Sequence, residues 1–281
     1  MTAAREPRDP APAGVAAPEP LPAGALDGHC HLDLIEQPVE EVLAAARAAG
    51  IRRVVTVGVD VATSVWSARC AAEHEGVYAA VAVHPNETEA AASSVPERDA
   101  ALRELRELAA LPRVRAVGET GLDYYRDYAS PQVQQQWFRA HIDIAKESGK
   151  PLMIHDRDAH EDVLRILEQE GPPAKVVFHC FSGDAVMAKR CADAGYVMSF
   201  AGNVTFRNAQ ALQEAAAAAP ADLLLPETDA PFLTPVPHRG RPNTPAMVAH
   251  TIRFLAGLKN LPLAELCERM SATAERLYGP W

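Results

Sequence analysis

The sequence is poor in cysteine, with five among 281 residues. An odd number, scattered and without any CxxC pair, argues against a disulfide framework and against a cysteine-rich zinc site. We interpret Cys30 and Cys180 as small buried side chains rather than thiolate ligands. Reduced thiols are typical of a cytoplasmic protein, which is the location we expect.

Long apolar runs are also missing. No stretch approaches the roughly 18 consecutive apolar residues of a membrane helix, and the N-terminus has neither the basic start nor the apolar centre of a secretory signal. We therefore expect no membrane partner, and no feature of the sequence indicates an obligate protein partner.

Positive charge is scarce, because 27 Lys and Arg residues stand against 37 Asp and Glu and give a formal net charge of −10. That balance disfavours a broad basic surface of the kind that coats nucleic acid. It does not exclude local binding of a phosphate by a metal ion or a few arginines. The glycine fingerprints of P-loop and Rossmann nucleotide sites are absent as well.

The chain divides into a short tail and one large domain. Residues 1–23 are dominated by Ala, Pro, Gly and charged residues. This composition buries too little apolar surface to offset the entropy of ordering, so we expect a disordered tail. Residues 24–281 are long and apolar enough to form a single domain with a substantial core.

From Ala25 onward, short apolar or β-branched runs alternate with longer stretches rich in Ala, Leu, Glu and Arg, which is typical of repeated βα units. The strands that the sequence predicts are Ala25–Cys30, Arg53–Val59, Tyr78–His84, Val114–Glu119, Leu152–His155, Val176–His179, Tyr196–Ala201 and Leu223–Glu227. The helices that it predicts include Val39–Ala49, Arg98–Ala110, Pro131–Ser148, Glu161–Gln169, Asn208–Ala219, Pro245–Leu258 and Leu263–Leu277. Eight strands in this alternation predict an α/β fold of the (β/α)8 TIM-barrel type.

Histidine and acidic residues stand at or near the C-terminal ends of these strands. They are His29, His31, His84, Glu119, His155, His179 and Asp229. Parallel barrels build their active sites at that end, so metal-binding residue types occur where a site is expected. His29 and His31 are two residues apart, which places both on one face of a strand where they can bind one ion together. The alternative is a pair of polar core residues bonded to the backbone.

The later strand ends supply the rest of a candidate site. Glu119 would be a costly buried charge unless it is paired or binds metal, and it could bridge two ions; a buried salt bridge is the alternative. His155 and His179 follow buried strands and could bind a second ion. Asp229 would lie beside the first two histidines in a closed barrel, which makes it the candidate general base.

Further residues have several possible roles. Asp27 could orient a metal-ligand side chain, and Glu227 could contact a metal ion or water. His84 could contact the substrate, orient a metal-ligand side chain, or be a loop histidine with satisfied hydrogen bonds and no role in the site. The candidate phosphate contacts, each of which could instead be a solvated surface arginine, are Arg126, Arg157, Arg207, Arg239 and Arg241. The aromatic residues that could stack unpaired bases or simply pack in loops are Tyr124, Tyr125, Phe181, Phe206 and Phe232.

Six ordered motifs resemble those of the TatD family of metal-dependent deoxyribonucleases, within the amidohydrolase-like superfamily. They are DGHCHLD at Asp27–Asp33, AVHPNE at Ala82–Glu87, GETGLDYYR at Gly118–Arg126, IHDRDA at Ile154–Ala159, HCFSG at His179–Gly183 and ETDAPFL at Glu227–Leu233. The resemblance runs from about Leu26 to Tyr278. It departs at Pro226, which removes a hydrogen-bond donor and puts pairing of the eighth strand in doubt, at Thr273, where Asn is common, and in the extra tail.

The resemblance implies a TIM-type barrel with two divalent ions. The ligands that it implies are His29, His31 and Asp229 at a first site, His155 and His179 at a second site, and Glu119 as a bridge between them. No ligand position is substituted. These donors suit Zn²⁺, Mn²⁺, Ni²⁺ and, less well, Mg²⁺, so the identity of the ions stays open.

The activity that the resemblance implies is hydrolysis of DNA phosphodiester bonds, as a 3′ to 5′ exonuclease acting on single-stranded or frayed DNA. We expect the ions to polarise the phosphodiester and activate a water that Asp229 helps to deprotonate, with Glu119 between the ions. One alternative is an amidohydrolase or an aminoacyl-tRNA deacylase on the same site, because activated water also attacks carbonyl carbon. Another is a metal-stabilised interaction protein without catalysis.

Overall fold

A computed structural model describes residues 16–91 and 94–280 of the chain. Eight parallel strands follow one another around a nearly closed barrel, each hydrogen-bonded to the next along the chain. The strands are β1 (Ala25–Cys30), β2 (Ile51–Val57), β3 (Val77–Val81), β4 (Val114–Asp123), β5 (Leu152–Arg157), β6 (Val176–Phe178), β7 (Val197–Phe200) and β8 (Leu224–Pro226). This confirms the predicted (β/α)8 architecture.

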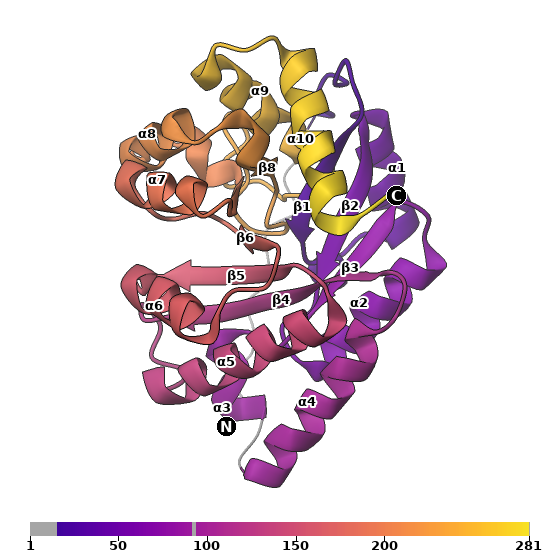
Figure 1. Ribbon diagram of the computed structural model, residues 1–281. Helices are drawn as coiled ribbons and strands as arrows, with labels where there is room; N and C mark the ends of the chain where they lie inside the picture. The colour runs from indigo at the N-terminus through magenta and orange to yellow at the C-terminus, as the bar shows by residue number, and fades with distance from the viewer. Residues whose placement is uncertain (1–15, 92–93, 281) are drawn as a thin grey trace, which may run out of the picture.

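Helices cover the outside of the strands (Figure 1). They are α1 (Val39–Ala48), α2 (Val61–Glu73), α3 (Thr88–Ala91), α4 (Val95–Ala109), α5 (Pro131–Ser148), α6 (His160–Glu170), α7 (Ala185–Asp193), α8 (Gln210–Ala218), α9 (Val248–Lys259) and α10 (Leu263–Tyr278). Their ends follow local sequence. Pro131 occupies the first turn of α5, where its missing N–H costs nothing, and Gly149 ends that helix with a left-handed φ of 67°.

The interior of the barrel is apolar below the strand ends. Side chains from neighbouring strands, among them Leu26, Val55, Tyr78 and Met153, form one buried cluster that α10 closes with Leu277. A larger cluster lies between the strands and the outer helices. Burial of this surface stabilises the barrel by roughly 25 cal/mol per Å² and holds its strand ends in fixed positions.

The barrel closes at the level of the candidate site. β8 is short and ends at Pro226, which pairs in register with Phe200 of β7. Beyond it, the Asp229 N–H donates to the His29 carbonyl at 2.9 Å, and the His31 N–H donates to the Ala230 carbonyl at 2.8 Å. The doubt that Pro226 raised about strand pairing is thereby removed, because the seam to β1 is made by the residues that follow it.

The N-terminal prediction requires a correction. Residues 1–15 lie outside the described part of the chain, but residues 16–23, expected to belong to a disordered tail, pack on the barrel. Leu21 is buried and its N–H donates to the Ala49 carbonyl, while the Arg253 guanidinium binds the carbonyl of Glu19 at 2.6 Å. One apolar side chain and an arginine on α9 thus attach this stretch to the barrel. Across the described residues, no helix has both the length and the apolar character to span a membrane.

Candidate metal centre

The strands deliver the site residues to one mouth of the barrel. His29 lies in β1 and His31 directly after it, while Cys30 points the other way and its thiol donates to the Val55 carbonyl at 3.5 Å. This is the alternation expected of a strand. His179 directly follows β6, and Asp229 lies three residues beyond β8.

Glu119 reaches the mouth differently from the prediction. β4 does not end at Glu119 but continues to Asp123, with a register shift against β5 between Val117 and Thr120. Glycines make this path possible: a Cβ on Gly121, at φ 137°, would lie 2.1 Å from the His155 carbonyl oxygen. The shift places the carboxylate at the level of the other strand ends although the strand runs on.

A first group of donor atoms converges between β1 and the loop after β8. Nε2 of His29 and Nε2 of His31 are 3.3 Å apart, and each is 3.6 Å from Oδ1 of Asp229. Two ligands on a tetrahedral ion with bonds of about 2.0–2.2 Å lie roughly 3.3–3.6 Å apart, so these atoms are spaced as ligands of one ion.

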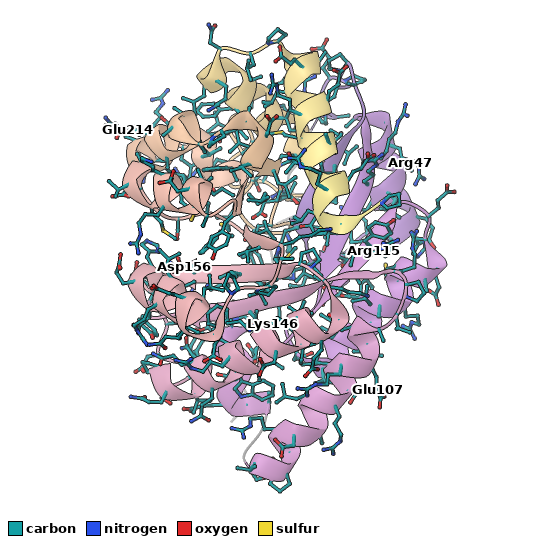
Figure 2. The ribbon with its side chains drawn as sticks, in the orientation of Figure 1. Arg47, Glu107, Arg115, Lys146, Asp156 and Glu214 are labelled. Atoms are coloured by element: carbon teal, nitrogen blue, oxygen red, sulfur yellow. The ribbon has the colours of Figure 1, made fainter. Side chains whose placement is uncertain are left out.

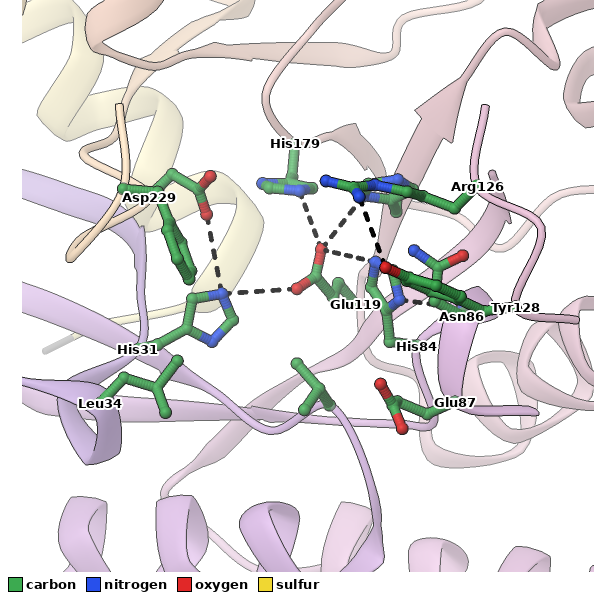
Figure 3. A pocket seen from close by; sticks show the side chains of 13 residues that line it. His31, Leu34, His84, Asn86, Glu87, Glu119, Arg126, Tyr128, His179 and Asp229 are labelled. Carbon is green, nitrogen blue, oxygen red and sulfur yellow. Dashed lines mark hydrogen bonds and ion pairs between the residues drawn. The ribbon is translucent and has the colours of Figure 1, made fainter. Parts of the chain in front are cut away.

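The carboxylate of Glu119 divides between this group and a second one. Its Oε1 is 3.6 Å from His29 Nε2 and 3.5 Å from His31 Nε2. Its Oε2 is 2.8 Å from His179 Nε2 and 3.4 Å from His155 Nδ1. Figure 3 shows His31 on one side of Glu119, with His179 meeting the other carboxylate oxygen. A carboxylate with one oxygen in each group is the geometry of a bridge between two ions.

Hydrogen bonds on the far side of three of the histidine rings leave the inward nitrogen of each available. Nδ1 of His31 contacts the Val57 carbonyl at 3.2 Å. Nδ1 of His179 contacts Glu227 Oε1 at 3.1 Å. His155 is reversed, because its Nε2 contacts Asp123 Oδ2 at 3.2 Å and its Nδ1 faces Glu119. Such outer contacts fix the tautomer and orientation of histidine ligands.

The charges and lone pairs of the centre favour the binding of cations. Burial disfavours a proton on His31, but ion pairing with Asp229 and Glu119 prevails and raises its pKa to about 9. Burial likewise opposes ionisation of Glu119, yet the surrounding histidines, His179 foremost, hold the pKa of this carboxyl well below its ordinary value. Buried carboxylates and inward lone pairs repel one another unless a positive charge lies between them, so the donor set fits divalent metal ions.

His84 lies beside the second group, not within a strand as predicted, because β3 ends at Val81. Its Nδ1 accepts the Asn86 N–H at 3.0 Å, so its Nε2 carries the ring proton in a neutral imidazole. That Nε2 is 3.8 Å from Glu119 Oε2, and burial lowers the pKa of His84 to about 3. His84 therefore presents an N–H donor to the centre, which favours a substrate or ligand-orienting role over an ordinary loop role.

Three acidic residues take roles that the sequence left open or missed. Glu227 does not point to the ion positions: its Oε1 accepts hydrogen bonds from His179 and from the Cys180 N–H. Asp27 accepts hydrogen bonds from the backbone N–H and the hydroxyl of Thr228 at 2.8 and 2.5 Å. It therefore joins β1 to the segment after β8 and does not orient the ring of a histidine ligand. Asp123, to which sequence reasoning gave no role, orients His155; its place in the GETGLDYYR motif was the available signal.

Two adjoining cavities, of about 360 and 500 Å³, open over the centre and share His155, His179 and Asp229 as walls. Arg126 lines both and Arg157 lines the larger one. Among the described residues, neither cavity includes the other predicted phosphate contacts, which are Arg207, Arg239 and Arg241. These three follow β7 and β8 along the chain, and the Arg239 guanidinium covers the ring of Phe206 at 4.2 Å.

Exposed rings at the mouth differ in part from those predicted. Phe232 lines both cavities and is 52% exposed, and Tyr125 is 60% exposed beneath the Arg157 guanidinium at 3.9 Å. Phe181 is buried, and the Tyr124 hydroxyl is bonded to Asp162. Burial leaves the Phe181 ring no face on which a base could stack, and Tyr124 is partly buried. Tyr128, which was not predicted, lines the smaller cavity and is 61% exposed.

Comparison with known proteins places this geometry in a family context. The family model described as TatD related DNase matches residues 26–279. The chain is 46% identical over 263 residues to an uncharacterized metal-dependent hydrolase TatD of Mycobacterium tuberculosis, covering 90% of this chain and 97% of that protein. It is 38% identical to the uncharacterized metal-dependent hydrolase YcfH of Escherichia coli K12, over 90% of this chain and 95% of that protein. The solved structure of YjjV, a TatD homolog from Escherichia coli K12, superposes with a TM-score of 0.85 at 27% identity, covering 92% and 98% of the two chains.

Proposed function

This chain belongs to the TatD family of metal-dependent hydrolases, and from that premise we propose that it hydrolyses phosphodiester bonds of single-stranded or frayed DNA, releasing nucleotides from the 3′ end. The observation that carries the proposal is the placement of Arg126 and Arg157 on the walls of cavities that open directly over the metal centre. Guanidinium groups beside paired cations suit a phosphate better than an uncharged amide.

In the proposed reaction, His29, His31 and Asp229 would hold one divalent ion and His155 and His179 a second, with Glu119 as a ligand available to either. When bound, divalent ions of this kind polarise a phosphoryl oxygen and lower the pKa of a coordinated water. Asp229, whose side chain is 16% exposed, is open to water and accepts its proton. The water oxygen bonds to phosphorus as the P–O3′ bond breaks, and the departing O3′ takes up a proton. The released nucleotide keeps the 5′-phosphate.

The chain's other residues position the substrate. His84 directs its Nε2–H toward the centre, where it donates to a phosphate oxygen. Arg126 and Arg157 bind the reacting phosphate and the backbone phosphate on its 5′ side. Tyr128 and Phe232 present exposed rings on which unpaired bases stack. A surface of net negative charge disfavours the long basic track that binds duplex DNA, which agrees with a strand-end substrate.

The test is a metal-titrated assay on end-labelled single-stranded DNA. We expect mononucleotides to appear from the 3′ end with Mn²⁺, Zn²⁺, Ni²⁺ or Mg²⁺ and to vanish with a chelator. Asp229→Asn and Glu119→Gln should lower the rate by about 10²–10⁴-fold, whereas Glu214→Gln on the outer helix α8 should leave it unchanged. If the DNA stays intact while an aminoacyl-tRNA or a small amide is hydrolysed, the protein is a hydrolase of another kind and not a nuclease. Metal binding without turnover of any of these would indicate an interaction protein.

A further inference from the structure

The two cavities over the metal centre differ in charge. The Arg126 side chain lines both, and the larger cavity adds Arg157. The larger cavity also has a carboxylate outside the metal centre, Asp156 near the end of β5 (Figure 2), but this residue is only 7% exposed and its Oδ2 contacts His160 Nδ1 at 2.8 Å. The corresponding carboxylate of the smaller cavity is Glu87.

Glu87 is open to a ligand. The residue is only partly buried, its carboxylate oxygens are accessible, and no other described residue forms an ion pair or a hydrogen bond with them. Figure 3 shows Glu87 beside His84 along one side of the smaller cavity. The smaller cavity therefore presents a free negative charge, whereas the larger one presents an additional positive charge.

A short turn, Pro85–Glu87, fixes the place of this carboxylate relative to the metal centre. The Glu87 N–H donates to the His84 carbonyl at 2.9 Å. The Asn86 side chain donates to Asp123 Oδ2 at 3.1 Å, and Asp123 in turn orients a ligand of the second ion. The turn is thus tied to the centre at two points, and Glu87 is held at the cavity wall.

The smaller cavity suits the end of a strand better than its interior. Its volume of about 360 Å³ lies in the lower part of the range of roughly 300–1,000 Å³ typical of small-molecule sites, which fits a single nucleoside. Leu34, Tyr128 and Phe232 give it exposed apolar surface for a base and a sugar. A strand that continued through it would bring another phosphate toward Glu87, and two negative charges repel each other.

From these features we propose that the smaller cavity receives the terminal nucleoside and that Glu87 recognises the end of the strand. Its carboxylate accepts a hydrogen bond from the free 3′-hydroxyl and repels a phosphate at the same place. The inference rests on the proposed nuclease function. Arg126, which lines both cavities, then binds the reacting phosphate, and the rest of the strand, with a phosphate on every nucleotide, runs through the larger cavity past Arg157. The same carboxylate limits cleavage to free ends.

The test uses three single-stranded oligonucleotides of one sequence whose 3′ ends carry a hydroxyl, a hydrogen or a phosphate. The metal-loaded full-length protein digests each of them. We expect kcat/KM to be about tenfold lower for the hydrogen end, because a hydrogen bond to a charged acceptor is lost. For the phosphate end we expect it to be about 100-fold lower, because like charges also repel. Equal rates on the hydroxyl end and on either of the other two overturn the inference.

Glu87→Gln keeps the size of the side chain and removes its charge. The penalty of the 3′-phosphate should fall at least tenfold in this variant. Glu36→Gln removes an exposed carboxylate from the loop after β1 that lines neither cavity, and it should keep the wild-type ratio. An unchanged ratio in Glu87→Gln, or an equal change in both variants, overturns the inference.

Binding measurements separate this inference from the nuclease proposal. Calorimetry with the Mn²⁺-loaded protein compares deoxycytidine 5′-monophosphate with deoxycytidine 3′,5′-bisphosphate. We expect the wild type to bind the monophosphate about tenfold more tightly, and the difference to shrink in Glu87→Gln. If no DNA is cleaved, the nuclease proposal fails and these affinities decide. The expected pattern then supports recognition of a free 3′-hydroxyl at Glu87, whereas equal affinities or tighter binding of the bisphosphate overturn it.

Discussion

Asp123→Asn is the substitution that separates the two groups of the metal centre. Asp123 Oδ2 accepts from His155 Nε2 at 3.2 Å and from Asn86 Nδ2 at 3.1 Å, and its Oδ1 accepts the N–H groups of Tyr125 and Arg126 at 3.0 and 2.9 Å. An asparagine keeps its oxygen for the two backbone donors and turns its NH₂ toward His155. That places a donor against the ring N–H that must exist if Nδ1 binds an ion.

The expected loss follows from these contacts. Two hydrogen bonds to a carboxylate oxygen are replaced by a repulsive pair, and bonds to charged groups contribute about 1.5–3 kcal/mol each. Removal of an outer contact to a histidine ligand typically lowers metal affinity about 10–100-fold, or about 1.4–2.7 kcal/mol. We therefore expect the second ion to bind 10–100-fold more weakly, while the first, at His29 and Asp229, keeps its affinity.

Isothermal titration of Mn²⁺ into metal-free protein measures both sites at once. The wild type should show two binding equivalents, and Asp123→Asn should show one of unchanged and one of reduced affinity. Asp127→Asn, an exposed carboxylate in the same loop, is the matched control and should behave as wild type. Equal weakening of both equivalents, or no weakening of either, would refute the reasoning that Asp123 acts through His155.

Three other substitutions probe separate parts of the structure. Glu227→Gln removes the charge that faces His179 Nδ1 and should lower the metal-dependent rate at limiting Mn²⁺ by about tenfold, with recovery at high Mn²⁺; no recovery would speak against an effect on metal binding. Thr228→Val removes the hydroxyl that donates to buried Asp27 and should lower the free energy of unfolding in urea by about 1–3 kcal/mol; an unchanged value would show that the β1–β8 seam does not depend on this bond. Burial lowers the pKa of His141 to about 3, so below its unfolded value near 6.5 the unfolded chain binds the extra proton, and stability falls as pH drops from 6.5 toward 3. The slope, about 1.4 kcal/mol per pH unit for one proton, should be smaller by that amount in His141→Gln between pH 6 and 4, and an equal slope in both proteins would contradict this assignment.

The sequence predicts the architecture because alternating strand and helix patterns are local properties. The HxH spacing at His29 and His31 places both rings on one face, and the structure has them there. What it does not predict is the path of β4, because the register shift that admits Glu119 depends on the close approach of Gly121 to β5. That approach is a tertiary contact, so the strand appeared to end four residues early.

The hydrogen bonds that orient the histidine ligands could not be predicted from local sequence patterns either. Asp123 and Glu227 act on histidines 32 and 48 residues away in the chain, and only the closed barrel brings them together. The loop arginines differ in their relation to the cavities. Arg207 and Arg241 follow strands β7 and β8 and do not line either cavity, whereas Arg126, in the short segment after β4, lines both.

The most direct test of the central claim is anomalous diffraction from crystals grown with Mn²⁺, measured on both sides of the Mn absorption edge. The account predicts two anomalous peaks separated by Glu119, one within bonding distance of His29, His31 and Asp229 and the other within bonding distance of His155 and His179. A single peak, or peaks away from these side chains at saturating Mn²⁺, would contradict it.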